Sequence, residues 1–333
     1  MPIQTPGVHH VTAIASDPQA NVDFYTDVLG LRLVKRTVNF DDTRTYHLYY
    51  GDEVGTPGTI LTFFPFGGGR SGRVGRGQAS ATAFVIPEGS VEFWIDRLES
   101  EGLTVGDPTE RFGGEEPSGS DSASGRRPRA ETVVPFEDRD GQPLELVTGD
   151  SDVEPWEGGP VPAKHAIRGF HGVTLDSLNP DATGSLLEAM GYERVAEAGE
   201  RTRYAADGER ASVVDVLDRP EGERGRQGAG TVHHVAFRAP DAETQAAWRE
   251  ELIEQGQRVT ERKDRRYFES VYFRESGGVL FEIATDGPGF TRDESVAELG
   301  SDLKLPPWLE SDRETIESQL ADIDAPATAE AER

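Results

Sequence analysis

The feature of this chain that most constrains its fold is a pattern that occurs twice. The run "GVHHVTA" at residues 7–13 returns as "TVHHVAF" at residues 231–237, with two adjacent histidines inside an otherwise apolar stretch. Both runs are typical of β-strands. Weaker copies of the same start are "SATAF" and "GFHGV". A pattern that returns in this way indicates that one supersecondary unit is repeated along the chain.

Each copy of the pattern precedes a segment with helical periodicity and then several β-rich runs. After the first copy, Asp17 predicts an N-cap, Pro18 the first helical turn and Gly30 the end of the helix. After the second copy, Ser90 is the expected N-cap and Gly102 the expected stop. The sequence therefore predicts an α+β fold built from four βαβββ units.

A single βαβββ unit cannot bury both its helix and one face of its sheet, so we expect the units to pair into two lobes. The expected limits of the four units and of the C-terminal tail are residues 1–68, 78–150, 168–219, 229–286 and 287–333. Three connecting features are also expected: a long loop at residues 108–130, a crossing between the halves at residues 149–168, and a tail helix in "DRETIESQLADI".

Composition excludes several classes of partner and site. The formal net charge is −27, from 61 acidic and 34 basic residues, which disfavours binding to nucleic acid or to anionic membranes. Dispersed carboxylates with little lysine are typical of proteins from a halophilic archaeon. The chain shows no membrane-length apolar run and no secretory leader, which predicts a cytoplasmic location. Because it has no cysteine, any metal must be bound by histidine or oxygen ligands.

Alignment of the units with one another singles out histidines at the first strand. His9 and His10 of the first unit correspond to His233 and His234 of the fourth. The third unit matches only the first position, with His171, and the second unit has neither histidine. Adjacent strand residues point to opposite faces, so each pair is expected to turn one imidazole inward.

The last strand of each unit supplies a second equivalent position. Glu282 of the fourth unit corresponds to Thr62, Glu145 and Asp215 of the first, second and third units. Only the fourth unit combines an inward histidine with a glutamate. The second and third units lack the histidine pair, so we expect their lobe to be structural.

Together these positions predict a metal site made of His10, His234 and Glu282. A lone histidine in a strand is usually a hydrogen-bonded core residue, but two pairs at equivalent positions and a matching glutamate favour metal binding. Two imidazoles and one carboxylate suit a divalent first-row ion and leave coordination positions open, as in non-heme Fe(II) enzymes. His9 and His233, expected to point outward, are left for supporting or lining roles.

At this point the sequence resembles a known family, the vicinal oxygen chelate superfamily of paired βαβββ units. Within it, the chain is similar to ring-cleaving dioxygenases of the hydroquinone type. The resemblance covers essentially the whole chain and is carried by long motifs, among them "HHVTAIASDPQANVDFYTDVLGLRLVKRTVNFDD", "VHHVAFRAPD" and "RKDRRYFESVYFRESGGVLFEIATDGPGF".

The resemblance implies both a ligand set and a reaction. The family's ligands match His10, His234 and Glu282, and the first and fourth units are expected to form the metal-binding lobe. The implied cofactor is Fe(II), with Mn(II) as the second choice, and the implied substrates are a small aromatic diol and O2. The family's residues beside the substrate match Tyr272, Arg265, His9 and His233.

Each of these neighbouring residues has an alternative interpretation. Tyr272 is expected to act as a hydrogen-bonding acid or base near the ring, or else to pack within its strand. Arg265 is expected to neutralise developing charge, or else to form a solvated ion pair. His9 and His233 are expected to orient the substrate or to carry protons.

Three rival functions stay open. A catechol-specific extradiol dioxygenase is the nearest. A glyoxalase-type isomerase would need a fourth protein ligand where this chain has Thr62. A metal-free binding protein of the same fold would not need His10, His234 and Glu282. Exposed sheet edges in such lobes favour a homo-oligomer.

Overall fold

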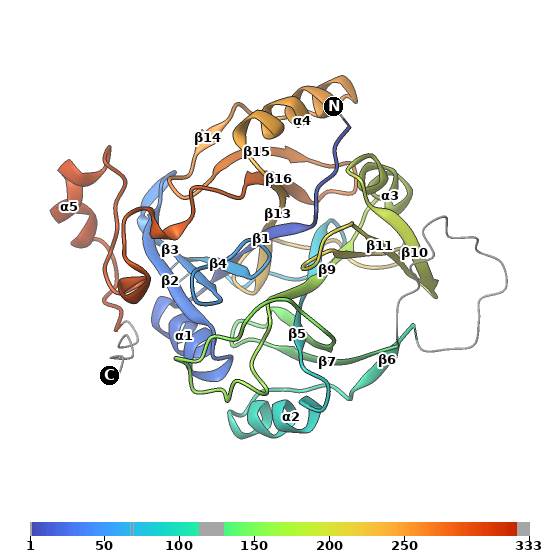
Figure 1. The fold of residues 1–333 in the computed structure, drawn as a ribbon, viewed down its shortest axis with the longest axis horizontal. Helices are drawn as coiled ribbons and strands as arrows, with labels where there is room; N and C mark the ends of the chain where they lie inside the picture. The colour runs from blue at the N-terminus through green and yellow to red at the C-terminus, as the bar shows by residue number, and fades with distance from the viewer. Residues whose placement is uncertain (1, 67, 69, 113–129, 325–333) are drawn as a thin grey trace.

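A computed structural model describes residues 2–66, 68, 70–112 and 130–324, which form two curled eight-stranded sheets (Figure 1). The first sheet contains β1 (Val8–Ala15), β2 (Arg32–Asn39), β3 (Asp42–Gly51), β4 (Ile60–Pro65), β13 (Thr231–Ala239), β14 (Lys263–Asp264), β15 (Glu269–Arg274) and β16 (Leu280–Thr285). The second contains β5 (Gln78–Ile86), β6 (Thr109–Arg111), β7 (Glu131–Glu137), β8 (Pro143–Thr148), β9 (Phe170–Asp176), β10 (Glu193–Ala198), β11 (Arg201–Ala205) and β12 (Val213–Leu217).

The strand orders confirm the expected α+β fold of paired βαβββ units. The first sheet runs β14-β15-β16-β13-β1-β4-β3-β2, and the second runs β10-β11-β12-β9-β5-β8-β7-β6. The first and last parts of the chain therefore share one sheet, and the two middle parts share the other. The limits of the four units stay a prediction.

Each sheet is built around one antiparallel pair of strands. In the first sheet β1 pairs with β13, and β4 and β16 lie parallel on either side of them. In the second sheet β5 and β9 form the corresponding pair, with β8 and β12 beside them. The central pair of the first sheet therefore brings the two copies of the histidine pattern together.

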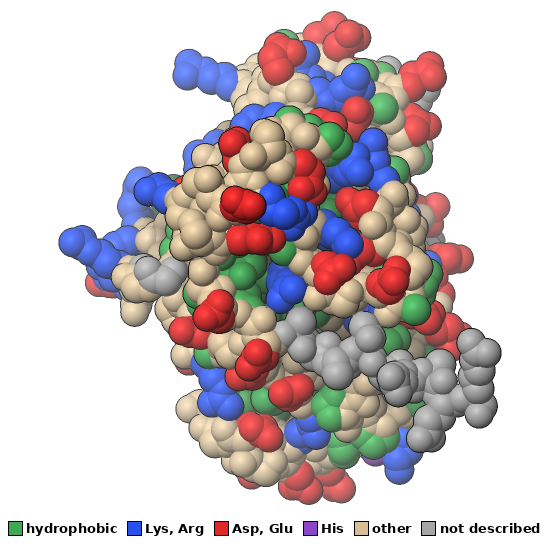
Figure 2. Space-filling view, turned by 90° about the vertical axis from the view of Figure 1, so that its left-hand side faces the viewer, with side chains coloured by type: hydrophobic (Ala, Val, Ile, Leu, Met, Phe, Trp, Pro, Cys, Tyr) green, Lys and Arg blue, Asp and Glu red, His purple; other side chains and the backbone are tan. Residues whose placement is uncertain are grey.

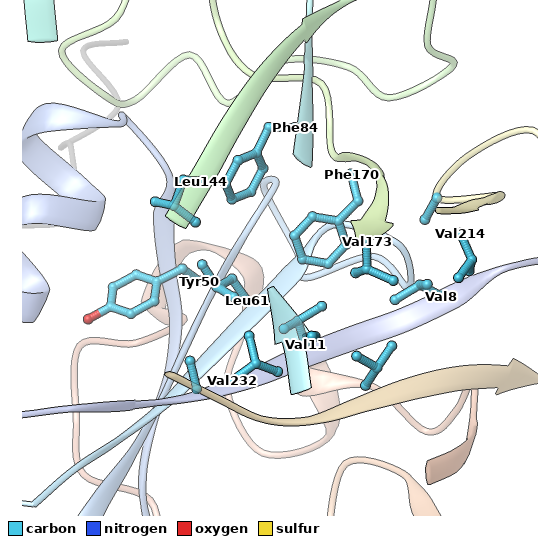
Figure 3. Packing of buried hydrophobic residues seen from close by; sticks show 14 of the residues in the cluster. Val8, Val11, Tyr50, Leu61, Phe84, Leu144, Phe170, Val173, Val214 and Val232 are labelled. Atoms are coloured by element: carbon cyan, nitrogen blue, oxygen red, sulfur yellow. The ribbon is translucent and has the colours of Figure 1, made fainter. Parts of the chain in front are cut away.

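The main hydrophobic core joins the two sheets. Val11 and Leu61 of the first sheet lie opposite Phe84, Leu144 and Phe170 of the second, and all five side chains are 0–1% exposed (Figure 3). Alternation along β1 and β4 directs these apolar residues to one face and leaves the other face for polar residues. The polar face of the first sheet, which carries His10 and is called the inner face below, is thus fixed by burial of the apolar one.

The helices agree with the expected positions, with differences in detail. They are α1 (Pro18–Asp23), which continues as a π-helical turn (Phe24–Val28), α2 (Val91–Ser100), α3 (Pro180–Ala189), α4 (Ala242–Glu254) and α5 (Arg313–Glu317). Short 3-10 turns follow β16 at Phe290–Arg292, Val296–Glu298 and Glu310–Asp312. None of the described helices is long and apolar enough to cross a lipid bilayer.

Asp17 caps α1 as expected, because its carboxylate accepts a hydrogen bond from the Ala20 amide at 2.8 Å. Ser90 occupies the N-cap position of α2 as expected, but its side chain does not cap the helix. Its hydroxyl lies 3.0 Å from Nδ1 of His165 and makes no capping hydrogen bond.

Two other expectations need correction. The tail helix is shorter than expected, since α5 ends at Glu317. The loop expected at residues 108–130 is interrupted at its start, because Thr109–Arg111 pairs with β7 as strand β6. The rest of that loop, residues 113–129, lies outside the described residues.

Candidate metal centre

His10, His234 and Glu282 converge on one point of the inner face. The two Nε2 atoms are 3.3 Å apart, and Oε2 of Glu282 lies 3.4 Å from Nε2 of His10 and 2.9 Å from Nε2 of His234. All three side chains are buried, with residue exposures of 1%, 5% and 0%. Within the described part of the chain, these three residues form the one group of three or more His, Cys, Asp or Glu side chains close enough to share a metal ion.

The spacing of the three donor atoms fits a divalent ion. Histidine nitrogen and carboxylate oxygen bind such ions at about 2.0–2.2 Å, so neighbouring donors lie about 3.0 Å apart at octahedral angles and about 3.4 Å apart at tetrahedral ones. The observed separations span this range. Oε2 of Glu282 is buried and makes no well-aligned hydrogen bond to any described residue. Three donor atoms that converge on one point in this way form a candidate metal site.

The side chains of His9 and His233 depart from the strict alternation of faces expected along a β-strand. In the β1–β13 pairing, the register shifts once at His9 and once at His233, so each is the extra residue of a bulge. The expectation that both rings point outward is wrong, because each bulge turns the extra ring toward its neighbour. Nδ1 of His9 lies 2.9 Å from Nδ1 of His10, and the same atoms of His233 and His234 are 2.8 Å apart.

These contacts determine which nitrogens of His10 and His234 would be free to bind a metal. If Nε2 of His10 carries a free lone pair for a metal, its proton is on Nδ1, and Nδ1 of His9 must accept it. The same holds for His234 and His233. Burial lowers the pKa of His9 well below its ordinary value and lowers the pKa of His233 to about 3, so both rings are neutral acceptors.

The carboxylate is held in the same manner. Ser270, two residues before Tyr272 on β15, donates to Oε1 of Glu282 at 2.5 Å, which leaves Oε2 directed at the histidines. Burial alone would raise the pKa of Glu282. The neighbouring imidazoles of His10 and His234 outweigh burial, so this pKa lies well below its usual range. Glu282 is therefore ionised, as a metal ligand must be.

The two sides of the cluster differ in exposure. On one side, His9 packs against Phe268, and a buried cluster that includes Tyr267, Phe290 and Leu299 fills the space behind it. The last two come from the segment after β16, which therefore closes this side. On the other side lie half-exposed residues, namely His47, Phe64, His233, Arg265 and Tyr272. The partly exposed neighbours of the cluster therefore lie on this second side, which is called the open side below.

Tyr272 and Arg265 lie together on the open side. Tyr272 is directly opposite Glu282 in the β15–β16 pairing, and its ring meets that of His234 edge-on at 5.7 Å. Nε of Arg265 donates to the Tyr272 hydroxyl at 3.0 Å, and Nη2 of Arg265 donates to Asp41 at 3.0 Å. Burial raises the pKa of Tyr272, and the charge of Glu282 adds to this, so the phenol keeps its proton.

Sequence reasoning missed a polar group on the neighbouring strands. His47 lies between Tyr49 and Thr62, with its ring nitrogens 2.8 Å from each hydroxyl, and Thr62 lies 2.9 Å from the hydroxyl of Thr12. The alternating "YHLYY" run was a usable signal, because His47 and Tyr49 fall on one face of β3. Asp41, in the turn before β3, gave no comparable signal, because its partner Arg265 is distant in sequence.

The second sheet carries a different arrangement at the equivalent positions. Glu145 is paired with Arg111 at 2.6 and 2.7 Å, and Asp215 with Arg203 at 2.8 and 3.0 Å. Guanidinium groups therefore occupy the place next to these carboxylates. Arg203 also contacts Glu131, which accepts from or pairs with His171 at 2.9 Å. This network supports the prediction that the second lobe is structural.

Comparison with known proteins identifies relatives of the whole chain. Residues 7–146 and 165–283 match the model of the Glyoxalase/Bleomycin resistance protein/Dioxygenase superfamily. The Bacillus subtilis (strain 168) protein named "Putative ring-cleaving dioxygenase MhqO" is 47% identical over 95% of this chain and 96% of its own length. The "Chlorohydroquinone/hydroquinone 1,2-dioxygenase" of Sphingobium indicum is 37% identical over 93% of this chain and 94% of its own.

Solved structures agree with these relatives. The crystal structure of a "putative dioxygenase" from Bacillus subtilis subsp. subtilis str. 168 matches with a TM-score of 0.89 and 45% identity, and the match covers 97% of this chain and 99% of that one. Glyoxalase I from Zea mays matches with a TM-score of 0.58 and 14% identity over 84% of this chain and 92% of its own, which is a likeness of fold alone. The superfamily indicated by the sequence motifs is thereby confirmed.

Proposed function

Because this chain belongs to the Glyoxalase/Bleomycin resistance protein/Dioxygenase superfamily, we propose that it is a metal-dependent dioxygenase that opens the ring of a hydroquinone-type aromatic diol. The observation that carries the proposal is the buried convergence of His10, His234 and Glu282 in a chain whose relatives are named as ring-cleaving or hydroquinone dioxygenases. Its substrates are the diol and O2.

The metal in this proposal is Fe(II), with Mn(II) as the alternative. Two neutral nitrogens and one carboxylate on one side of an ion favour such metals and leave positions for other ligands. When bound, the ion would supply the electron transfer between diol and O2 and would lower the pKa of a coordinated phenol.

The residues of the open side have separate roles in the proposal. Tyr272, a protonated phenol beside His234, hydrogen-bonds to the substrate and exchanges a proton with it. Arg265 holds the Tyr272 hydroxyl and places positive charge where the substrate becomes anionic. His9 and His233 act by accepting the Nδ1 protons of His10 and His234, and half-exposed His233 also borders the substrate.

The surroundings of the open side favour an aromatic substrate. The Phe64 ring lies 4.4 Å from the His47 ring and 5.8 Å from the His233 ring, and Tyr272 faces His234. Several ring faces and edges near one metal cluster suit a flat aromatic molecule. Thr62 disfavours the isomerase alternative, because its hydroxyl already lies within hydrogen-bonding distance of both His47 and Thr12.

Oxygen uptake tests the proposal. The full chain is loaded anaerobically with Fe(II) or Mn(II), and O2 consumption is measured with hydroquinone, methylhydroquinone and catechol at low and high salt. We expect uptake with the two hydroquinones and release of a ring-opened product. Uptake with catechol alone would replace the hydroquinone assignment by the catechol one. If protein that holds stoichiometric metal consumes no O2 with any diol, the proposed dioxygenase activity on aromatic diols is contradicted.

A further inference from the structure

A chain of four side chains crosses the inner face beside the metal cluster. The Tyr49 hydroxyl is 2.8 Å from Nδ1 of His47, Nε2 of His47 is 2.8 Å from the Thr62 hydroxyl, and the Thr62 hydroxyl is 2.9 Å from that of Thr12. The residues come from three neighbouring strands, and Thr62 is directly opposite Tyr49 on β3 and Thr12 on β1. The contacts therefore follow from strand register.

The Thr12 end of this chain is adjacent to the metal ligands. Thr12 lies two residues after His10 on β1, without a register shift between them, so both side chains are on the inner face. Thr12 is also the direct partner of His234 across the β1–β13 pair, which puts their Cβ atoms about 5 Å apart. In the part of the protein that the structure describes, the side-chain partner of the Thr12 hydroxyl is Thr62.

The chemistry of the other end gives the chain a direction. Tyr49 is 1% exposed, and burial raises the pKa of its phenol well above 10, so it keeps its proton. A phenol is a better donor than an alcohol, and an imidazole nitrogen is its best available acceptor here. Nδ1 of His47 therefore accepts from Tyr49, and the proton of a neutral His47 is on Nε2. His47 then donates to Thr62, and Thr62 donates to Thr12.

A single proton on His47 is required for this order. Burial against Tyr49 and Phe64 lowers the pKa of His47 well below its ordinary value, and nearby His10 and Arg265 act in the same direction. If His47 were protonated on both nitrogens, Tyr49 would have to accept rather than donate. A neutral ring keeps all four groups aligned, and the Thr12 proton is the one left without an acceptor in the chain.

We propose that His47 is a positioning residue. It sets the direction of this chain of hydrogen bonds so that the Thr12 hydroxyl donates its proton to an oxygen atom of the bound aromatic diol. A donor whose orientation is set before the substrate arrives stabilises a developing negative charge without reorganisation. The choice of an oxygen-bearing aromatic ligand rests on the proposed function, whereas the direction of the hydrogen bonds from Tyr49 to Thr12 does not.

The direction of hydrogen-bond donation along Tyr49, His47, Thr62 and Thr12 is tested by determining the tautomer of His47. The full chain, labelled with 15N-histidine and loaded with diamagnetic Zn²⁺, is examined by long-range 1H–15N NMR near neutral pH. We expect a neutral ring with its proton on Nε2. The Tyr49→Phe variant should show a mixture of tautomers. The control Tyr50→Phe, which removes a neighbouring buried hydroxyl bonded to Asn21 at 2.9 Å, should leave His47 unchanged. A proton on Nδ1, or on both nitrogens, in the unaltered protein would overturn the proposal.

The consequence for turnover is measured with a matched pair at Thr62. Thr62→Val keeps the shape and removes the hydroxyl, and we expect kcat/KM for the diol to fall about tenfold with unchanged metal content. Thr62→Ser keeps the hydroxyl and should restore most of the activity. Equal activity of the two variants would contradict the proposal. If the unaltered protein turns over no diol, the proposed function fails, and the NMR result still decides the direction of the chain.

Discussion

At the scale of single residues, the candidate metal site depends on one ionised carboxylate, Glu282, among buried groups. Glu282 is 0% exposed, its Oε1 is held by Ser270, and its Oε2 lies within 3.4 Å of both imidazoles. Glu145 occupies the corresponding place in the second sheet but is paired with Arg111. The two glutamates therefore allow the same substitution to be compared in two surroundings.

We expect Glu282→Gln to weaken metal binding at least 100-fold, because an amide oxygen is a much poorer ligand than a carboxylate. Glu145→Gln should leave metal binding unchanged. Metal titration of both variants, with the content measured after dialysis, checks this. If Glu282→Gln keeps its full metal content, or if Glu145→Gln loses metal, the assignment of Glu282 as a metal ligand is contradicted.

Asp138 offers a second residue-level prediction, on stability. It is buried, accepts from the Tyr25 hydroxyl at 2.9 Å and from the amides of Asp140 and Gln142, and burial raises its pKa from 3.8 to about 6. A carboxyl that binds its proton more tightly in the folded state stabilises the fold below pH 4, and this contribution is lost as the pH rises through 6.

For Asp138→Asn, which does not titrate, we expect the difference in unfolding free energy to shift in favour of the variant as the pH rises. The full shift is about 3 kcal/mol, and roughly half of it falls between pH 5 and pH 7.5. Urea unfolding at several pH values measures the difference. A constant difference across this range would show that Asp138 is ionised throughout.

At the scale of elements, two bulges and one ion pair shape the site. The bulges at His9 and His233 are related by the antiparallel β1–β13 pairing, so the extra histidines lie at opposite ends of the cluster. His9 ends on the closed side, where it is 1% exposed, and His233 on the open side. Equivalent sequence positions therefore receive different surroundings.

The two edges of the first sheet are joined by Asp41, which precedes β3, and Arg265, which follows β14. Because the Asp41 side chain is 60% exposed, the pair contributes less than about 1 kcal/mol to stability, but it orients the guanidinium that holds Tyr272. We expect Asp41→Asn to lower kcat/KM severalfold at low salt, with little change in stability.

The neighbouring Asp42 is the control for this prediction, since it pairs with exposed Arg44 in its own strand. Steady-state kinetics of Asp41→Asn and Asp42→Asn should separate, and the separation should shrink in molar salt, which screens exposed pairs. Equal kinetics of the two variants would show that Asp41 does not orient Arg265.

At the scale of the whole molecule, the two lobes share a fold and differ in what occupies the inner face. In the second lobe Arg203, 2% exposed, pairs with Asp215 and Glu131 and stacks over Phe112 at 4.3 Å. We expect Arg203→Met to lower the unfolding free energy by about 3 kcal/mol, because the buried Asp215 and the partly buried Glu131 each lose a guanidinium partner and keep only Arg201 and His171, respectively.

Urea unfolding and metal titration together check this expectation. Metal affinity of the folded Arg203→Met variant should be unchanged, since the cluster lies in the other sheet. The control Arg194→Met, at an exposed pair with Glu197, should cost less than about 1 kcal/mol. A loss of metal binding in the Arg203 variant would contradict the separation of the two lobes.

The surface charge belongs to the molecule as a whole. The net charge is −27, and acidic side chains are spread over the visible face, interspersed with basic ones (Figure 2). Repulsion among them destabilises the folded state at low salt and is screened at high salt. We expect the melting temperature to rise as KCl increases from about 0.1 to 2 M, measured by calorimetry. A melting temperature independent of salt would show that the charges are already balanced locally.

Sequence alone predicted the repeat, the fold and the three residues that converge in the candidate metal site, because each depends on local periodicity. The apolar alternation of "GVHHVTA" and "TVHHVAF" fixes which face of each strand is buried, and equivalent positions in repeated units occupy equivalent places in space. The alternation argument failed at His9 and His233, because a bulge depends on how two distant strands pair and not on either strand by itself.

What the sequence determined by itself is thus the set of donors, His10, His234 and Glu282. Only the tertiary structure decided how they are supported, since His47, Thr62 and Asp41 meet their partners through strand register and sheet curvature. It also decided which side of the cluster is open, because the segment after β16 fills the other side. The physical reason is that periodicity is a property of one strand, whereas contacts and exposure are properties of the packed chain.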